Sequence, residues 1–183
     1  MGDLLFKNKY RVPSARLTDW DYSAGGFYFV TVCVKQHECI FGGINNGVMC
    51  LNRLGAVVYK CWKEIPQHFP FVRLGEFVVM PNHVHGILEI CENKNLGVGV
   101  ETQNIASLQT PYKNKFGPQS KNLSSIVRGF KIGVTKYTNQ NNIDFQWLSR
   151  FHDHIIRNEQ SLYNIRKYTI NNPANWRLDK FFN

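Results

Sequence analysis

Two histidines separated by one apolar residue are the feature of this sequence most able to do chemistry. His83, Val84 and His85 lie in the apolar stretch 80–88. In a β-strand, residues i and i+2 point to the same face. A strand here would therefore present two imidazoles side by side while Val84 packs behind them. Because neutral imidazole is a common metal ligand, this spacing predicts half of a metal site.

A second pair of polar residues, near the C-terminus, could complete the site. Tyr168 and Asn172 are four residues apart, so in a helix they lie on one face. If that face covers the histidine strand, Asn172 would offer a third ligand and Tyr168 would place its hydroxyl beside the metal. Two nitrogens and one oxygen suit Mg²⁺ or Mn²⁺. A cation that polarises a phosphate would then help tyrosine to form a covalent phosphodiester.

Composition and charge indicate the class of partner. The chain has 183 residues, most simply a single domain over 1–183, and its 22 Lys+Arg against 13 Asp+Glu give a net charge of +9. This excess favours nucleic acid as a partner, ahead of an anionic membrane surface, although a basic protein without such a partner is the alternative. No apolar run approaches a membrane span, and no signal peptide is recognisable, so we expect a cytoplasmic protein with no membrane partner. The five cysteines include no C-x-x-C pair and indicate reduced thiols.

The sequence predicts a mixture of strands and helices. Residue patterns predict strands at 27–34, 71–80 and 83–90, a hairpin around 44–48, and a short strand or extended segment within 145–156. They predict helices from 54 to Pro66, over 123–137, and from an Asn158 cap to Asn172. Residues 91–121 lack periodicity and predict a flexible surface insertion, with a specificity loop as the alternative.

This order predicts an α+β fold with a ferredoxin-like antiparallel sheet. Helices would pack on one face of the sheet, and an additional C-terminal helix would carry Tyr168. Gly86, next to His85, is expected to leave room beside the histidines for something to approach closely.

Two motifs identify a family that the chain resembles. PNHVHG at 81–86 is followed far downstream by YTINNP at 168–173, and further matching segments lie at 76–80 and 154–159. Together they resemble the HUH-type single-tyrosine transposases, most closely the group associated with repetitive extragenic palindromes (REP) in bacteria. The resemblance runs over most of the chain.

The resemblance implies a metal-dependent transposase that cleaves and rejoins DNA. His83 and His85 would be the paired metal ligands, and Asn172 falls where the family has its third ligand. Tyr168 would attack a phosphate of single-stranded DNA that carries a hairpin, as at palindromic repeats, and would leave a 5′-phosphotyrosine and a free 3′-hydroxyl. Whether Tyr168 acts within its own subunit or across a homodimer is open at this stage.

Seven further side chains could contact DNA phosphates, although an Arg or Lys in such a position is more often an ordinary surface charge, and His154 is explained equally well as a structural group. They are Arg128, Lys131, Arg150, His154, Arg157, Arg166 and Lys167. Two other functions remain open on the sequence alone. One is a domesticated, non-catalytic protein that binds DNA or RNA hairpins. The other is an unrelated metal-dependent hydrolase that uses the histidine pair.

Overall fold

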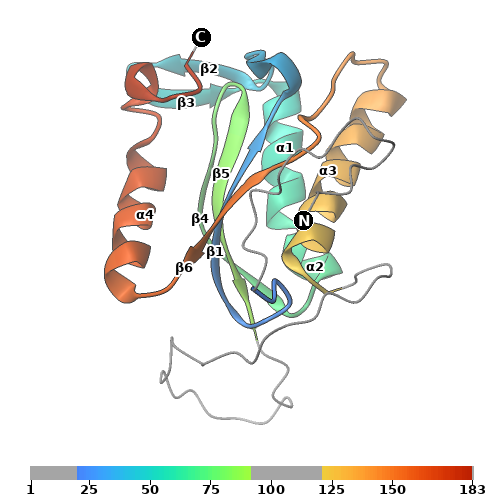
Figure 1. The fold of residues 1–183 in the computed structure, drawn as a ribbon. Helices are drawn as coiled ribbons and strands as arrows, with labels where there is room; N and C mark the ends of the chain where they lie inside the picture. The colour runs from blue at the N-terminus through green and yellow to red at the C-terminus, as the bar shows by residue number, and fades with distance from the viewer. Residues whose placement is uncertain (1–19, 92–120, 183) are drawn as a thin grey trace, which may run out of the picture.

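A four-stranded antiparallel sheet forms the centre of the protein (Figure 1). The structure, a computed structural model, describes residues 20–91 and 121–182. The predicted insertion at 91–121 lies outside the described residues except for its two end positions. The sheet has the order β4-β5-β1-β6, formed by β1 (Gly26–Cys33), β4 (Val72–Val79), β5 (His83–Ile90) and β6 (His152–Ile156). This order confirms the ferredoxin-like prediction.

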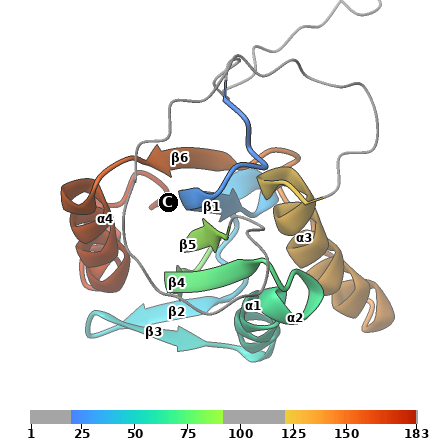
Figure 2. The ribbon, with the colours of Figure 1, turned by 90° about the horizontal axis from the view of Figure 1, so that it is seen from below.

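Helices α1 (Arg53–Lys63) and α3 (Leu123–Gln140) cover one face of the sheet and form the main core with it (Figure 2). Asn52 begins α1 by accepting a hydrogen bond from the Gly55 N–H at 2.9 Å. A capping box between Asn122 and Ser125 begins α3. Pro66 does not end helical structure as predicted, because it occupies the first turn of the short helix α2 (Ile65–His68), where a missing N–H is tolerated.

The predicted role of Gly86 is wrong. Gly86 points to the core face of β5, and a Cβ added to it would lie 2.2 Å from Cζ2 of Trp62. The ring of Trp62, on α1, therefore fills the room that the missing side chain leaves. Gly86 serves helix packing behind the histidines, not access to them.

Helix α4 (Glu159–Asn171) lies across the opposite face of the sheet, as Figures 1 and 2 show. Asn158 caps it, as predicted, by accepting a hydrogen bond from the Ser161 N–H at 2.8 Å. The protein therefore has three layers, with α1 and α3 on one side and α4 on the other. The alternate residues of β5 that include both histidines point toward the α4 side of the sheet.

The remaining elements are short. Strands β2 (Gly42–Asn45) and β3 (Val48–Leu51) form the predicted hairpin, and 3₁₀ turns lie at η2 (Lys35–His37) and η3 (Trp176–Leu178). The hairpin turn, Asn46-Gly47, has positive φ at both residues, as this turn requires. Within the predicted extended segment 145–156, only β6 joins the sheet, and an isolated bridge pairs Trp147 with Val34.

Candidate active site and metal centre

The histidine pair lies on strand β5 with the geometry predicted from its spacing. His83 and His85 are 0% and 1% exposed, and their ring centroids are 4.3 Å apart. The antiparallel pairing of β1 with β5 places Thr31 directly opposite His85. Both rings point away from the main core, toward the layer that contains α4.

One nitrogen of each ring is held by a neighbouring side chain. Nδ1 of His83 lies 2.8 Å from Oδ1 of Asn82, and Nδ1 of His85 lies 2.8 Å from Oγ1 of Thr31. An amide oxygen can only accept, so Nδ1 of His83 carries the proton and Nε2 keeps its lone pair. Such contacts on the second nitrogen are typical of metal-binding histidines, because they fix the orientation of the ring.

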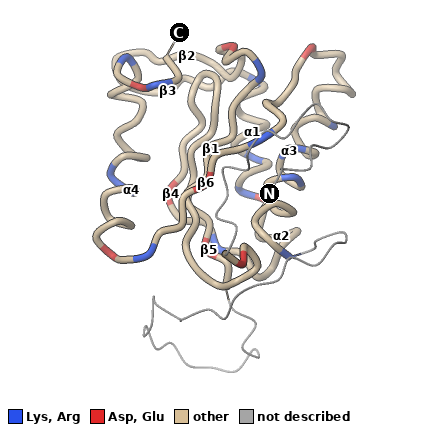
Figure 3. Tube along the Cα trace, viewed as in Figure 1, with Lys and Arg blue, Asp and Glu red and all other residues tan. Residues whose placement is uncertain are grey.

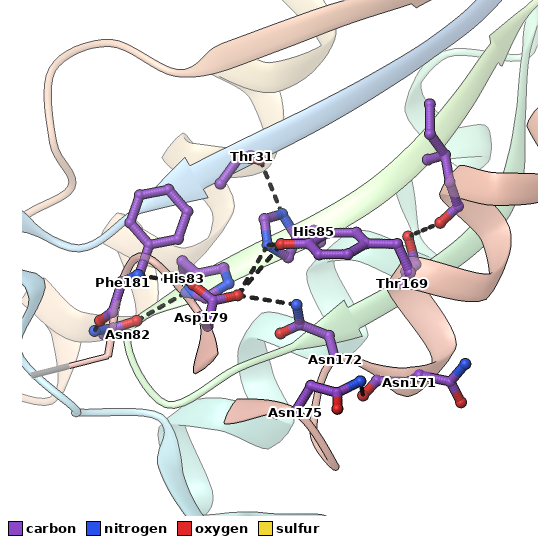
Figure 4. Close-up of polar contacts among 12 residues, drawn as sticks. Thr31, Asn82, His83, His85, Thr169, Asn171, Asn172, Asn175, Asp179 and Phe181 are labelled. Atoms are coloured by element: carbon purple, nitrogen blue, oxygen red, sulfur yellow. Dashed lines mark hydrogen bonds and ion pairs between the residues drawn. The ribbon is translucent and has the colours of Figure 1, made fainter. Parts of the chain in front are cut away.

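Asp179, which sequence analysis did not select, completes a cluster of three metal-ligating groups with His83 and His85. Their ligand atoms all lie within 4.8 Å of one another. Oδ2 of Asp179 is 3.9 Å from Nε2 of His85 and accepts a hydrogen bond from the Asn172 amide at 2.9 Å. Figure 4 shows this carboxylate between the histidines and Asn172. Its other oxygen accepts the backbone N–H of Phe181 at 2.8 Å.

Two buried polar atoms at this cluster lack a hydrogen-bond partner. They are Nε2 of His83 and Oδ1 of Asn172, which is 2% exposed. A buried polar atom without a partner costs free energy, so a native site normally has a use for it. Both atoms have lone pairs that a cation would accept, and the donor set of imidazoles, carboxylate and amide oxygen fits a divalent ion.

Tyr168 projects from α4 to the edge of the same cluster. Its hydroxyl lies 3.2 Å from Nε2 of His85 and 3.3 Å from Oδ2 of Asp179. The ring packs edge-on against Phe29, with centroids 6.0 Å apart, and the side chain remains 43% exposed. A phenol hydroxyl therefore lies beside the three metal-ligating groups with one side open to solvent.

The charges at the site favour a cation. Burial lowers the pKa of His83 to about 2 and also lowers the pKa of His85, so both imidazoles are neutral at pH 7. Burial alone would raise the pKa of Asp179, but His85 and the N–H donors of Phe181 and Asn172 hold it well below its usual range. Two neutral imidazoles beside one carboxylate leave a net negative charge in a buried position.

The predicted DNA-contacting side chains do not gather at this cluster. Arg128 and Lys131 line a groove on α3, whereas His154 and Arg157 line a hollow beside the start of α4. Arg150 is exposed in the segment before β6.

Arg166, Lys167 and Arg157 each contact another side chain of the protein. Arg166 donates from Nε to Glu76 of β4 at 2.9 Å. The Lys167 ammonium lies 4.5 Å from the centroid of the Tyr163 ring, and the Arg157 guanidinium lies 5.7 Å from that of Trp20. Arg166 and Lys167 share α4 with Tyr168, so they are the two predicted contacts on the helix that reaches the site.

Comparison with known proteins gives sequence relatives and a solved structure with the same fold. No family model matches the chain. An uncharacterised protein of Haemophilus influenzae is 44% identical over 170 residues, 92% of each chain. A second protein of that organism, named "Putative REP-associated tyrosine transposase", is 25% identical over 155 residues, 84% of this chain and 73% of the relative.

The fold is also that of a solved structure. A REP-associated tyrosine transposase bound to a REP hairpin matches with a TM-score of 0.60 over 92% of this chain and 77% of that one. At 18% identity, this likeness shows the shared fold. Within the described residues, no helix is long and apolar enough to cross a membrane.

Proposed function

We propose that this chain, which belongs to the REP-associated tyrosine transposase family, cleaves and rejoins single-stranded DNA with Tyr168 as the nucleophile. The observation that carries the proposal is the position of the Tyr168 hydroxyl, 3.2 Å from His85 and 3.3 Å from Asp179. A nucleophile beside a set of metal-ligating groups is the arrangement that activates a weak nucleophile for phosphoryl transfer.

His83, His85 and Asp179 would hold a divalent cation, Mg²⁺ or Mn²⁺. Asn172 supports this set in two ways, because its amide N–H holds Asp179 and its unpartnered Oδ1 is a further oxygen ligand. Asp179 would therefore act together with Asn172, the third ligand predicted from the sequence. When bound, the cation supplies a Lewis acid that polarises a phosphate and neutralises charge as it develops.

The covalent step is a displacement at phosphorus. Oη of Tyr168 forms a bond to phosphorus, and the bond to the 3′-oxygen of the preceding nucleotide breaks. That oxygen takes a proton and becomes a free 3′-hydroxyl, while the following strand remains attached as a 5′-phosphotyrosine. Attack of a 3′-hydroxyl on this phosphotyrosine rejoins a strand and returns the tyrosine.

The phenol must lose its proton during attack. Burial, followed by the nearby Asp179 carboxylate, raises the pKa of Tyr168 to about 12, so the phenol is protonated at neutral pH. Asp179 accepts its hydrogen bond and orients the hydroxyl, and the exposed side of Tyr168 lets the proton pass to solvent. A cation bound by Asp179 would reduce the negative charge that opposes this ionisation.

The substrate that we propose is single-stranded DNA with a hairpin. Two observations support it: the basic charge of the chain, and the family, in which a relative of the same fold is bound to a REP hairpin. Arg166 and Lys167 are proposed as phosphate contacts for the strand that reaches Tyr168, because they lie on the same helix.

The test is formation of a covalent adduct. Protein and Mn²⁺ are incubated with 3′-labelled single-stranded DNA that carries an inverted-repeat hairpin from the neighbourhood of the gene, and the label is followed on a denaturing gel. We expect wild type to retain the label and Tyr168→Phe to lose it. Tyr163→Phe is the matched control, because Tyr163 lies on the same helix and is 51% exposed. An adduct that persists in Tyr168→Phe, or hairpin binding without any adduct by wild type, contradicts the proposal.

A further inference from the structure

Helix α4 buries fewer residues than the helices on the other face of the sheet. Within α4 only Thr169 is buried, whereas α1 buries four residues and α3 buries seven. A helix of 13 residues is also marginally stable in water by itself. The position of Tyr168 therefore depends on a small number of contacts that hold α4 on the sheet.

An ion pair joins α4 to the edge strand β4. Nε of Arg166, two residues before Tyr168, donates to Oε2 of Glu76 at 2.9 Å. Glu76 is the single acidic residue of β4, and Figure 3 shows Lys and Arg in the part of α4 that lies beside this strand. The pair thus connects the sheet to α4 within one helical turn of the tyrosine.

A β-bulge in β4 places Glu76 on the face of the sheet that α4 covers. The register of β4 with β5 shifts between Leu74 and Phe77. Gly75 and Glu76 therefore together oppose the single residue Ile87. Leu74 and Phe77 both pack against the main core, although strict alternation would put residues three apart on opposite faces. Without the extra residue, Glu76 would share the core face with Leu74.

Gly75 allows this bulge to lie close to β5. A Cβ added to Gly75 would lie 3.0 Å from Cβ of Ile87. Ile87 is fully buried and shares its face of β5 with His83 and His85. Bulges often re-aim a side chain beside an active site. Here the bulge directs one carboxylate from the sheet toward α4.

We propose that Glu76 is a positioning residue, which holds α4 through Arg166 where Tyr168 reaches the candidate metal centre. The inference rests on the proposed function, because it concerns the same nucleophile. A misplacement of about 1 Å can slow a reaction about 100-fold, so the docking of α4 matters for the rate. Glu76 engages Nε of Arg166, and the guanidinium has further N–H donors that remain available for a phosphate.

The first test measures the docking of α4 without DNA. Hydrogen exchange of residues 159–172 is followed by mass spectrometry in the full-length protein. An exposed ion pair changes an equilibrium by up to about fivefold, and an undocked α4 would unfold. We therefore expect Glu76→Gln to speed exchange in α4 by about two- to fivefold.

Glu64→Gln is the matched control for this measurement. Glu64 forms an ion pair with Lys60 of α1, and its side chain is 32% exposed, against 33% for Glu76. The control variant should exchange in α4 like wild type. Unchanged exchange in Glu76→Gln, or an equal increase in Glu64→Gln, would overturn the inference.

The second test separates positioning from DNA binding. With saturating hairpin DNA and Mn²⁺, Glu76→Gln should form the covalent adduct about two- to fivefold more slowly. Its DNA affinity, measured by fluorescence anisotropy, should be unchanged or higher, because a negative charge is removed. Arg166→Glu should also be slow, and combining it with Glu76→Arg should recover the rate by restoring the pair in reverse. A double variant as slow as Arg166→Glu would reject the ion pair as the positioning contact.

The two tests distinguish this inference from the proposed chemistry. If wild type forms no adduct, the chemistry is rejected, and hydrogen exchange alone decides whether Glu76 holds α4. If Glu76→Gln forms the adduct at the wild-type rate, the positioning role is rejected and the chemistry stands.

Discussion

Each imidazole of the candidate metal centre has one neighbouring side chain that holds its orientation. Thr31 holds His85 through Nδ1 at 2.8 Å. We expect Thr31→Val, which keeps the shape and removes the hydroxyl, to weaken Mn²⁺ binding by about 10- to 100-fold, the usual effect of losing such a partner. Isothermal titration calorimetry measures the affinity. Thr169→Val is the control, because it also removes a buried hydroxyl bond, to the Ile165 carbonyl, without touching the site. Equal affinities in the two variants would contradict this role for Thr31.

The buried histidines also predict how stability depends on pH. Burial lowers the pKa of His83 to about 2 and lowers that of His85, whereas both rings titrate near 6.5 when unfolded. Below pH 6.5 the unfolded chain therefore binds more protons, and the metal-free protein loses stability as pH falls. From pH 6.5 to 5, His83 alone should cost about 2 kcal/mol. Urea unfolding in the presence of chelator measures this loss. His83→Gln should reduce the pH dependence, and an equally steep loss in that variant would rule out His83 as its source.

At the scale of elements, strand β5 and helix α4 could be predicted because their signals are local. Alternation placed both histidines on one face, and the Asn158 cap set the start of the helix that carries Tyr168. The way α4 docks on the sheet depends on contacts across the fold, which no local pattern contains. The sequence therefore predicted that Tyr168 lies near His85 only on the condition that α4 docks over the histidine strand.

Asp179 was not predicted from the sequence, because its position also depends on contacts across the fold. It follows the 3₁₀ turn η3, whose packing returns the chain from the end of α4 to the histidines. No spacing rule joins it to His83, which lies on a distant strand. The one available signal was that Asp179 is the sole acidic residue after Glu159. A single carboxylate near the tyrosine helix of a basic chain was a reasonable third candidate ligand.

The proposed role of Asp179 as a metal ligand can be tested by removing the charge of its side chain. We expect Asp179→Asn to weaken Mn²⁺ binding by at least about tenfold, because a carboxylate is the only anionic ligand in the proposed set. Calorimetric titration measures the loss. Leu178→Ala is the neighbouring control, since Leu178 is 86% exposed and should leave the affinity unchanged. An Asp179→Asn variant with wild-type affinity would leave Asn172 as the third ligand, as the sequence alone predicted.

Across the whole molecule, the sheet separates the main core from the side chains of the candidate metal centre. Val84 and Leu88 on one face of β5 pack in the main core, while His83 and His85 on the other face the cluster with Asp179. Alternate residues of β5 thus pack in the core or face the cluster, because successive side chains of a strand point to opposite faces. A substitution on one face should therefore affect mainly stability, and one on the other mainly metal binding.

Gly86 provides the sharpest test of this division, because it lies next to His85 but faces the core. A Cβ at Gly86 would lie 2.2 Å from the fully buried ring of Trp62. Gly86→Ala should therefore lower the free energy of unfolding by about 1–3 kcal/mol, the usual cost of overpacking. Chemical denaturation measures it, with Gly43→Ala as the control, since a Cβ at Gly43 meets nothing within 4 Å. If both variants were equally stable, Trp62 could move aside without cost, and the core behind the histidines would be less tightly packed than these contacts require.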